Sequence, residues 1–196
     1  MNAGAPQADP LLGRRLDGRF ELRRRLATGG MGAVYEAVQH PLGRRVAVKV
    51  LQTGSAADDG SFRDRFFLEA SAVARLAHPN TIVVHDHGGT EDGLYYIAME
   101  HLDGETLSQR LRARGPLAPR EALHVGRQIA GSLREAHAEG LVHRDLKPGN
   151  VMLAPRGGDP LFVKVLDFGL VQVLGEGAPA AQLTQRGMMM GSPRYM

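Results

Sequence analysis

The chain has 196 residues, of which 43% are hydrophobic and 5% aromatic, and it contains no cysteine and no tryptophan. This length predicts one domain, built as a single unit or as two small lobes around a mostly aliphatic core. The absence of cysteine excludes disulfides, thiolate zinc sites and a cysteine nucleophile, and it fits a reducing compartment such as the cytoplasm. No stretch approaches the ~20 apolar residues of a membrane-spanning helix, so we expect no membrane span.

The net charge is only +3, although arginines gather near the N-terminus at 14–15, 19 and 23–25 and again at 44–45. A nucleic-acid surface needs aromatic platforms or a known binding motif beside such charges, and neither is present. We therefore interpret the arginines as a solvated strand face and expect no nucleic-acid partner.

The N-terminal half reads as strands and one helix. Residues 1–15 are expected to form a flexible tail. Residues 19–52 predict strands separated by turns at Gly29-Gly30 and at 41–43, and residues 94–99 predict a further strand. Residues 61–77 predict a helix, because apolar residues recur at helical spacing. The expected inward face consists of Phe62, Phe66, Glu69, Val73 and Leu76.

The C-terminal half reads as mainly helical. A polar joint at Asp103-Gly104 marks the expected boundary between an N-lobe over 16–102 and a C-lobe over 103–196. Helices are predicted near 106–113 and 120–138, followed by short strands at 151–154 and 162–166. The inner face of the longer helix is expected to contain Ala122, Val125, Ile129, Leu133 and Ala136.

A glycine-rich segment lies between the first two predicted strands. It runs Leu26, Ala27, Thr28, Gly29, Gly30, Met31, Gly32, Ala33, Val34. It joins two strands and opens no helix, which excludes the dinucleotide fingerprint, and it lacks the Gly-Lys-Ser/Thr ending of a P-loop. Such a turn can fold over phosphates because backbone N–H groups can approach them closely. A plain hairpin turn is the alternative.

A lysine and a glutamate fit a partly buried ion pair. In Val46-Ala47-Val48-Lys49, alternation places Ala47 and Lys49 on one face of the strand. The small side chain of Ala47 leaves room for the flat base of a nucleotide, and the neighbouring Lys49 supplies positive charge for its phosphates. Glu69 lies within the apolar stripe of its helix, where a carboxylate needs a partner, and Lys49 is the candidate. The alternatives are a surface lysine and a glutamate that reaches water at the helix rim.

The segment 143–150, His-Arg-Asp-Leu-Lys-Pro-Gly-Asn, carries the strongest pattern. Asp145 and Asn150 share one loop and can face one site. Pairing of strands 151–154 and 162–166 would place Asn150 beside Asp167 of the Asp-Phe-Gly triplet at 167–169. Two hard oxygen ligands at that point suit Mg²⁺.

These segments together resemble the eukaryotic-like protein kinases, in particular the bacterial serine/threonine kinases. The glycine-rich turn, Val46 to Lys49, His143 to Asn150 and Asp167 to Gly169 occur in the order of that family. The resemblance runs from about residue 16 to the last residue. It implies an α+β, two-lobed protein-kinase-like fold with a small β-rich N-lobe, one N-lobe helix and a mainly helical, partial C-lobe.

The resemblance also implies a role for each matching residue. Asp145 would be the catalytic base and Lys147 would neutralise the transferred phosphoryl group, which favours Ser/Thr as acceptor. Lys49, paired with Glu69, would hold the ATP phosphates, and Asn150 and Asp167 would hold Mg²⁺. The implied ATP-binding set is Leu26, Ala27, Thr28, Gly29, Gly30, Met31, Gly32, Val34, Ala47, Lys49, Glu100, Leu102 and Met152, with Met99 as gatekeeper.

Further implied features concern alignment and regulation. Val73, His143 and Phe168 match the stacked residues that align the two lobes. Arg144 matches an arginine that awaits a phosphate on the activation segment, for which Thr184 is the expected acceptor. Ser192 matches a hydroxyl next to the substrate. The implied partners are proteins with Ser/Thr acceptors and a second copy of the chain during autophosphorylation.

Two departures from the family pattern keep other functions open. Ala27 stands where the family has a glycine, which predicts a stiffer loop. The chain stops at Met196, where the family places its Ala/Ser-Pro-Glu motif, which predicts a truncated C-lobe and an aggregation-prone chain. An inactive nucleotide-binding or pseudokinase-like module is therefore the alternative to a kinase. A small-molecule phosphotransferase of related fold is a third interpretation. A metal site at His85 and His87 is disfavoured against loop polarity.

Overall fold

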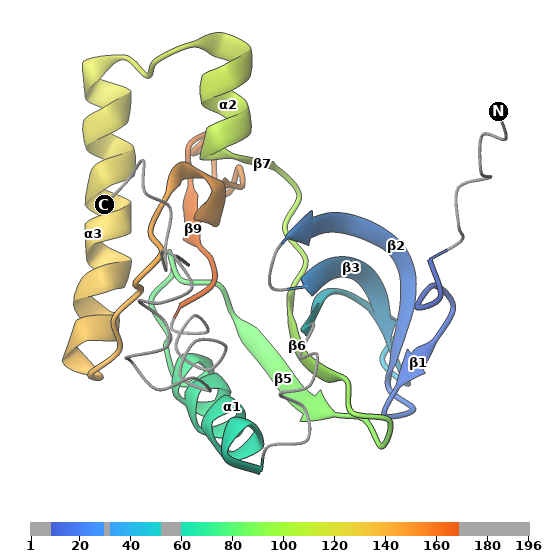
Figure 1. Cartoon of the computed structure of the whole chain (residues 1–196). Helices are drawn as coiled ribbons and strands as arrows, with labels where there is room; N and C mark the ends of the chain where they lie inside the picture. The colour runs from blue at the N-terminus through green and yellow to red at the C-terminus, as the bar shows by residue number, and fades with distance from the viewer. Residues whose placement is uncertain (1–8, 30–31, 52–59, 169–196) are drawn as a thin grey trace, which may run out of the picture.

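The structure is a computed structural model that describes residues 9–29, 32–51 and 60–168 (Figure 1). A curled antiparallel sheet forms one part of the molecule, with the strand order β1-β2-β3-β4-β6-β5. Its strands are β1 (Arg15–Leu16), β2 (Phe20–Gly29), β3 (Gly32–Gln39), β4 (Arg44–Leu51), β5 (Val84–Gly89) and β6 (Tyr95–Glu100). The helix α1 (Gly60–Ala74) packs beside β5.

The second part of the molecule contains two helices and a small sheet. The helices are α2 (Leu107–Arg114) and α3 (Pro119–Ala138), and the sheet has the order β7-β8-β9. Its strands are β7 (Glu105–Thr106), β8 (Val151–Leu153) and β9 (Val163–Val165), and a 3-10 turn (Pro148–Asn150) precedes β8. This division into a β-rich and a mainly helical lobe confirms the predicted fold class.

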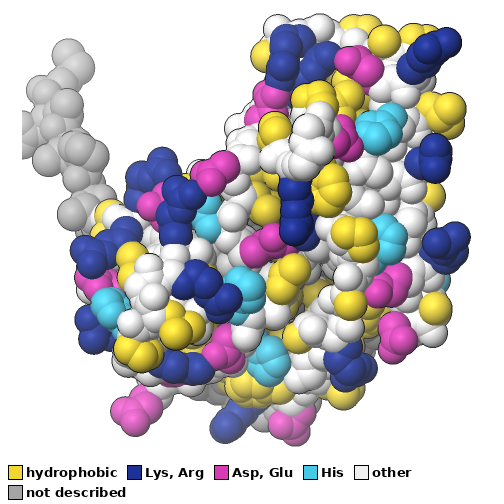
Figure 2. All heavy atoms as spheres, turned by 180° about the vertical axis from the view of Figure 1, so that it is seen from behind, with side chains coloured by type: hydrophobic (Ala, Val, Ile, Leu, Met, Phe, Trp, Pro, Cys, Tyr) yellow, Lys and Arg dark blue, Asp and Glu magenta, His cyan; other side chains and the backbone are white. Residues whose placement is uncertain are grey.

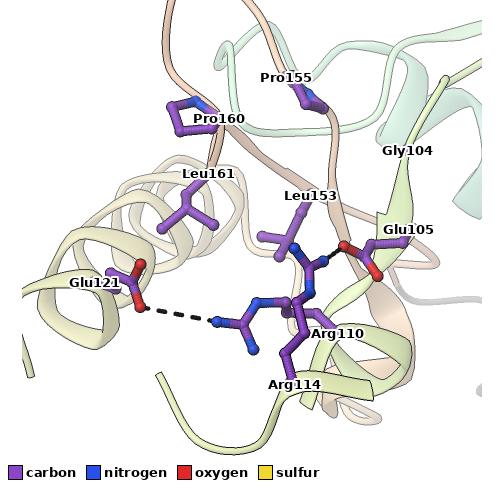
Figure 3. A pocket seen from close by; sticks show the side chains of 9 residues that line it. All are labelled: Gly104, Glu105, Arg110, Arg114, Glu121, Leu153, Pro155, Pro160 and Leu161. Carbon is purple, nitrogen blue, oxygen red and sulfur yellow. Dashed lines mark ion pairs between the residues drawn. The ribbon is translucent and has the colours of Figure 1, made fainter. Parts of the chain in front are cut away.

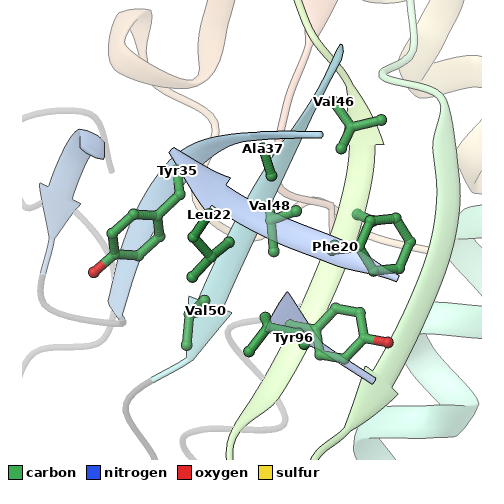
Figure 4. Close-up of a cluster of buried hydrophobic side chains, with 10 residues drawn as sticks. Phe20, Leu22, Tyr35, Ala37, Val46, Val48, Val50 and Tyr96 are labelled. Atoms are coloured by element: carbon green, nitrogen blue, oxygen red, sulfur yellow. The ribbon is translucent and has the colours of Figure 1, made fainter. Parts of the chain in front are cut away.

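Alternation along β4 separates the two faces of the large sheet, as the sequence predicts. Val46, Val48 and Val50 point to one face, where they pack with Phe20, Leu22, Tyr35, Ala37 and Tyr96 (Figure 4). Ala47 and Leu51 point to the other face and pack with Phe62 and Phe66 of α1. Lys49 therefore lies on the α1 side of the sheet, among apolar neighbours.

Both predicted helix stripes are buried, with one exception. Phe62, Phe66, Val73 and Leu76 are all less than 9% exposed. On α3, Val125 and Ala136 are buried in the core of the helical lobe, and Ile129 and Leu133 pack against it. Ala122 is exposed, so the inner face of α3 begins one turn later than predicted.

The N-terminal tail is shorter than predicted. Residues 9–15 run along β2, where Gly13 N donates to Leu22 O and Leu22 N donates to Arg14 O. Asp9 accepts a hydrogen bond from the Tyr35 hydroxyl at 3.0 Å and forms an ion pair with Arg25 at 3.2 Å. The prediction of a flexible tail through residue 15 thus extends too far. Its first eight residues lie outside the described part.

The arginine-rich strands carry their own counter-charges. Arg14 pairs with Asp92, Arg24 with Glu36, and Arg45 with Asp103. On the face seen in Figure 2, basic and acidic side chains alternate over the β-rich lobe and do not merge into one basic patch. This arrangement fits the solvated-face interpretation. Among the described helices, none has the length and apolarity needed to cross a bilayer.

Candidate functional site

The glycine-rich segment joins the antiparallel strands β2 and β3, whose register shifts between Arg25 and Ala27. Ala27 pairs with Val34, and Gly29 pairs with Gly32, while Gly30 and Met31 lie outside the described residues. Gly32 has φ +135°, and a Cβ there would lie 2.0 Å from Val50 O, so only glycine fits. Ala27 is not among the described residues with positive φ. Alanine is therefore free of left-handed backbone strain at that position, and the stiffer loop remains a prediction.

Several of the predicted adenine-contacting residues lie together beneath this hairpin. Ala47 pairs with Met99 across β4 and β6, and both belong to one buried cluster. Val34 and Leu102 pack against that cluster. Met152 is half-buried on β8 of the other lobe, and Glu100 is the last residue of β6. Leu26 and Thr28 are exposed on β2.

Lys49 reaches from β4 to Asp167, the second residue after β9. Its Nζ lies 2.8 Å from Asp167 Oδ1, and its side chain is 9% exposed. A buried ammonium is costly unless it is paired, so this contact accounts for its burial. Glu69 is half-buried on the α1 face that also holds Phe66 and Val73. Its pairing with Lys49 remains a prediction.

Asp145 is held by residues of its own loop. Lys147 Nζ lies 2.6 Å from Asp145 Oδ2. Asn150 Nδ2 donates to Asp145 O at 2.8 Å and to Asp145 Oδ2 at 3.2 Å. The predicted base, the predicted phosphoryl-neutralising lysine and one predicted metal ligand thus contact one another within a single loop.

The pairing of β8 with β9 joins this loop to Asp167, as the sequence predicts. Val151 pairs with Val165, and Leu166 N donates to Asn150 O at 2.9 Å. Asp167 has φ +58° and Arg144 has φ +63°, two non-glycine residues in the left-handed region. Such backbone strain is characteristic of functional sites, where the surrounding structure holds it in place.

His143 also links the loop that contains Asp145 to the segment that contains Asp167. Its Nε2 donates to Leu166 O at 2.7 Å, and its ring lies 4.8 Å from the Phe168 ring. Burial lowers the pKa of His143 below its usual range, so the imidazole is neutral. Val73 and Phe168 belong to one hydrophobic cluster, and His143 stacks on Phe168. The three predicted aligning residues therefore lie together.

The amide of Asn150 and the carboxylate of Asp167 fit a magnesium ion. The Asn150 amide nitrogen faces Asp145, so its oxygen lies on the opposite side of that amide. Asp167 supplies a second hard oxygen donor, and oxygen donors of this kind are those that Mg²⁺ prefers.

His85 and His87 lie on β5. Within the described ranges, no group of three or more His, Asp or Glu side chains has metal-binding geometry. His87 packs against the rings of Phe66 and Phe67, and its Nε2 lies 3.2 Å from Ser71 Oγ. It therefore packs between β5 and α1 and is more than a polar loop residue.

A separate pocket of about 410 Å³ opens on the helical lobe (Figure 3). Leu153 and Leu161 line it, while Arg110 faces Glu121 and Arg114 faces Glu105. Its charges are paired with one another, and none of the predicted nucleotide-contacting residues lines it. We assign it no role in the site.

Some predicted residues lie outside the description, and one relevant residue was not predicted. Gly169, Thr184 and Ser192 lie within residues 169–196, outside the described part of the chain. The unpredicted residue is Lys164, which is buried in β9. Its only sequence signal is a lysine between two valines directly before the Asp-Phe-Gly triplet.

Comparisons with known proteins agree with this geometry. The family model described as protein kinase domain matches residues 20–196. Serine/threonine-protein kinase PknA of Mycobacterium tuberculosis is 44% identical over 191 residues, covering 95% of this chain and 42% of that protein. PrkC of Bacillus subtilis is 38% identical over 186 residues, covering 95% of this chain and 27% of that protein. The chain thus spans less than half the length of these relatives.

Solved structures show the same fold. The crystal structure of the M. tuberculosis PknI kinase domain matches with a TM-score of 0.69 and 32% identity, covering 91% of this chain and 68% of that chain. Rad53 in complex with AMP-PNP matches with a TM-score of 0.67 and 27% identity, covering 78% of this chain and 38% of that one. Because the family model matches residues 20–196, which is most of this chain, the chain belongs to the protein kinase domain family.

Proposed function

We propose that the chain binds Mg·ATP and transfers the γ-phosphate to serine or threonine hydroxyls of proteins. The observation that carries this proposal is the linkage of two loops. Leu166 donates to Asn150 and accepts from His143, so the segment with Asp145 is tied to the segment with Asp167. Asp167 in turn pairs with Lys49 of β4. The relatives PknA and PrkC are named serine/threonine-protein kinases. The structural neighbour Rad53 is in complex with the ATP analogue AMP-PNP.

Each residue then has one task in the transfer. Asp145 accepts the proton of the acceptor hydroxyl. At the same time the hydroxyl oxygen bonds to the γ-phosphorus, and the bond between the γ-phosphorus and the β-phosphate oxygen breaks. Lys147, 2.6 Å from Asp145 Oδ2, is placed to neutralise charge on the moving phosphoryl group. Lys49 holds the nucleotide phosphates.

Asn150 and Asp167 would hold Mg²⁺, which supplies charge neutralisation at the phosphates when bound. Ala47, Val34, Met99 and Leu102 form an apolar wall suited to the flat face of adenine. We place this activity in the cytoplasm, where ATP is available.

A phosphate-transfer assay tests the proposal. The chain is incubated with radiolabelled Mg·ATP and a generic basic protein, beside Asp145→Asn. We expect transfer by the parent chain and a loss of about 10²–10⁴-fold in the variant, the usual contribution of a general base. ATP binding without transfer would support the inactive module instead. Label on an aminoglycoside, and none on protein, would support a small-molecule phosphotransferase.

Autophosphorylation near Thr184 is the second part of the proposal, and it would require a second copy of the chain in trans. Arg144 is exposed beside Asp145 and carries the charge that such a phosphate would meet. Mass spectrometry after incubation with Mg·ATP should find phosphate between residues 170 and 192. Its absence from that segment in an active preparation would contradict this part.

A further inference from the structure

A buried lysine lies in the middle of β9, shortly before Asp167. The Lys164 side chain is 3% exposed, and its Nζ lies 2.7 Å from Glu100 Oε1. The same Nζ donates to Thr81 O at 3.0 Å. Burying an ammonium is costly unless a counter-ion and hydrogen bonds satisfy it. The fold meets this cost with partners from two other segments of the chain.

The carboxylate that pairs with Lys164 belongs to Glu100, and Glu100 also forms hydrogen bonds with Val83. Glu100 Oε1 also accepts a hydrogen bond from Val83 N at 2.8 Å, and Glu100 N donates to Val83 O at 2.9 Å. Glu100 ends β6, where the chain crosses toward the helical lobe. The side chain of Glu100 is therefore fixed between β9 and the segment before β5.

β9 is itself anchored to the segment that precedes β5. Val165 N donates to Asn80 O at 2.7 Å, and Ile82 N donates to Val165 O at 3.0 Å. The Asn80 side chain donates to Val163 O at 2.8 Å. Hydrogen bonds thus set the position of β9 along residues 80–82. The Lys164–Glu100 ion pair connects the end of β6 to β9 as well.

We infer that Lys164 is a positioning residue that fixes the distance between the adenine-contacting end of β6 and the phosphate-side carboxylate of Asp167. This inference rests on the proposed function, because it assigns the two ends to one bound ATP. Leu102 lies two residues after Glu100, and Asp167 lies two residues after the end of β9. Asp167 Oδ1 lies 2.8 Å from Lys49 Nζ. A ligand that spans both ends binds best when their separation is set in advance.

The inference predicts a difference between two ligands. Adenosine contacts only the β6 end, whereas Mg·ATP contacts both ends. In Lys164→Met, a replacement of similar length without charge, we expect the Kd for Mg·ATP to rise about tenfold, as for the loss of a well-coupled contact. The Kd for adenosine should stay within about twofold. Isothermal titration calorimetry on the folded chain measures both.

Two further variants make the test decisive. Glu100→Gln keeps the shape and the bond from Val83 but removes the charge, and it should weaken Mg·ATP in the same direction. It also carries the test if Lys164→Met does not fold. The double variant should be no weaker than the worse single variant, because both remove one interaction. Arg45→Ala, which breaks an exposed ion pair near the same end of β6, is the matched control and should leave both Kd values unchanged.

Several outcomes would overturn the inference. Equal weakening of adenosine and Mg·ATP would make Lys164 a local support of the adenine end only. Unchanged Mg·ATP binding in both single variants would remove any role in nucleotide binding, as would additive losses in the double variant. A parent chain that binds Mg·ATP but transfers no phosphate would contradict the proposed function and leave this inference standing.

Discussion

Two regions of this molecule contain ion pairs between a basic side chain and a carboxylate, one region buried and the other exposed to solvent. Between the lobes, Lys49 and Lys164 are 9% and 3% exposed as side chains, and each has a carboxylate within 2.8 Å. On the surface of the β-rich lobe, Arg45 of β4 pairs with Asp103 at 2.7 Å, but the two side chains are 53% and 75% exposed. Distance alone does not distinguish these pairs. Burial does, because water and salt screen the exposed pair, whereas a buried charge depends on its partner.

The comparison implies that removal of a buried charge between the lobes changes function strongly, whereas removal of an exposed charge on the β-rich lobe changes little. Variants at Lys49 and Arg45 test this difference directly, and variants in the glycine-rich hairpin and at His143 test how far burial governs other parts of the same region.

The largest effect is expected at Lys49. Lys49→Met removes the cation that contacts Asp167 and, in our proposal, the ATP phosphates. Loss of one such preorganised electrostatic contact costs about 10²–10³-fold in turnover. Initial rates at saturating Mg·ATP, with circular dichroism to confirm folding, measure it. A folded variant with parent-like turnover would contradict both the role of Lys49 and the comparison.

A smaller effect is expected in the glycine-rich hairpin, where two glycines occupy different surroundings. A Cβ on Gly32 would meet Val50 O at 2.0 Å, whereas a Cβ on Gly29 meets nothing within 4 Å. Gly32→Ala should lower stability by about 1–3 kcal/mol, the cost of a strained backbone conformation, and weaken Mg·ATP binding. Urea denaturation and calorimetry should detect both changes.

Gly29→Ala is the matched control for that prediction. It should leave stability and the Kd for Mg·ATP near the parent values, because the added methyl group has open space. Equal effects of the two substitutions would show that glycine acts there through chain flexibility and not through close packing.

His143 predicts a modest dependence of stability on pH. Burial lowers its pKa in the folded state, so the unfolded chain binds the proton at higher pH than the folded chain does. The stabilisation is complete above the unfolded value of about 6.5 and is lost as pH falls below it. The melting temperature should therefore fall from pH 7 to pH 5. His143→Gln, which can still donate to Leu166 O, should show a flatter profile.

The smallest effect is expected at the exposed ion pair of Arg45 and Asp103. Arg45→Ala should change the free energy of unfolding by less than about 0.5 kcal/mol, since exposed ion pairs contribute little. Urea denaturation at low and moderate salt measures it. A clearly larger loss of stability would show that burial does not separate the two regions.

Much of the site follows from local sequence. Strand alternation places Ala47 and Lys49 on one face, and the two short strands before the Asp-Phe-Gly triplet pair so that Asn150 adjoins Leu166, as the structure confirms. These features depend on spacing within a few residues, which periodicity encodes directly. The glycine pattern similarly anticipates the hairpin, although only the close approach of Val50 explains why Gly32 must be glycine.

Other features escape such reasoning. β5 is a strand although it reads Val-His-Asp-His-Gly-Gly, because pairing with β6 outweighs its weak strand propensity. Residues 9–15 are ordered by contacts with β2 and Tyr35, which no local pattern announces. In both cases the stabilising partner is distant in sequence.

The sequence by itself determined the order of the kinase motifs, the alternation of β4 and the inner faces of α1 and α3, because each depends on neighbouring residues. Only the tertiary structure decided that Lys164 is buried. Alternation places it opposite Val163 and Val165, on what reads as a solvent face. That face is covered by Thr81 and Glu100, and the burial of a charge depends on which distant groups surround it.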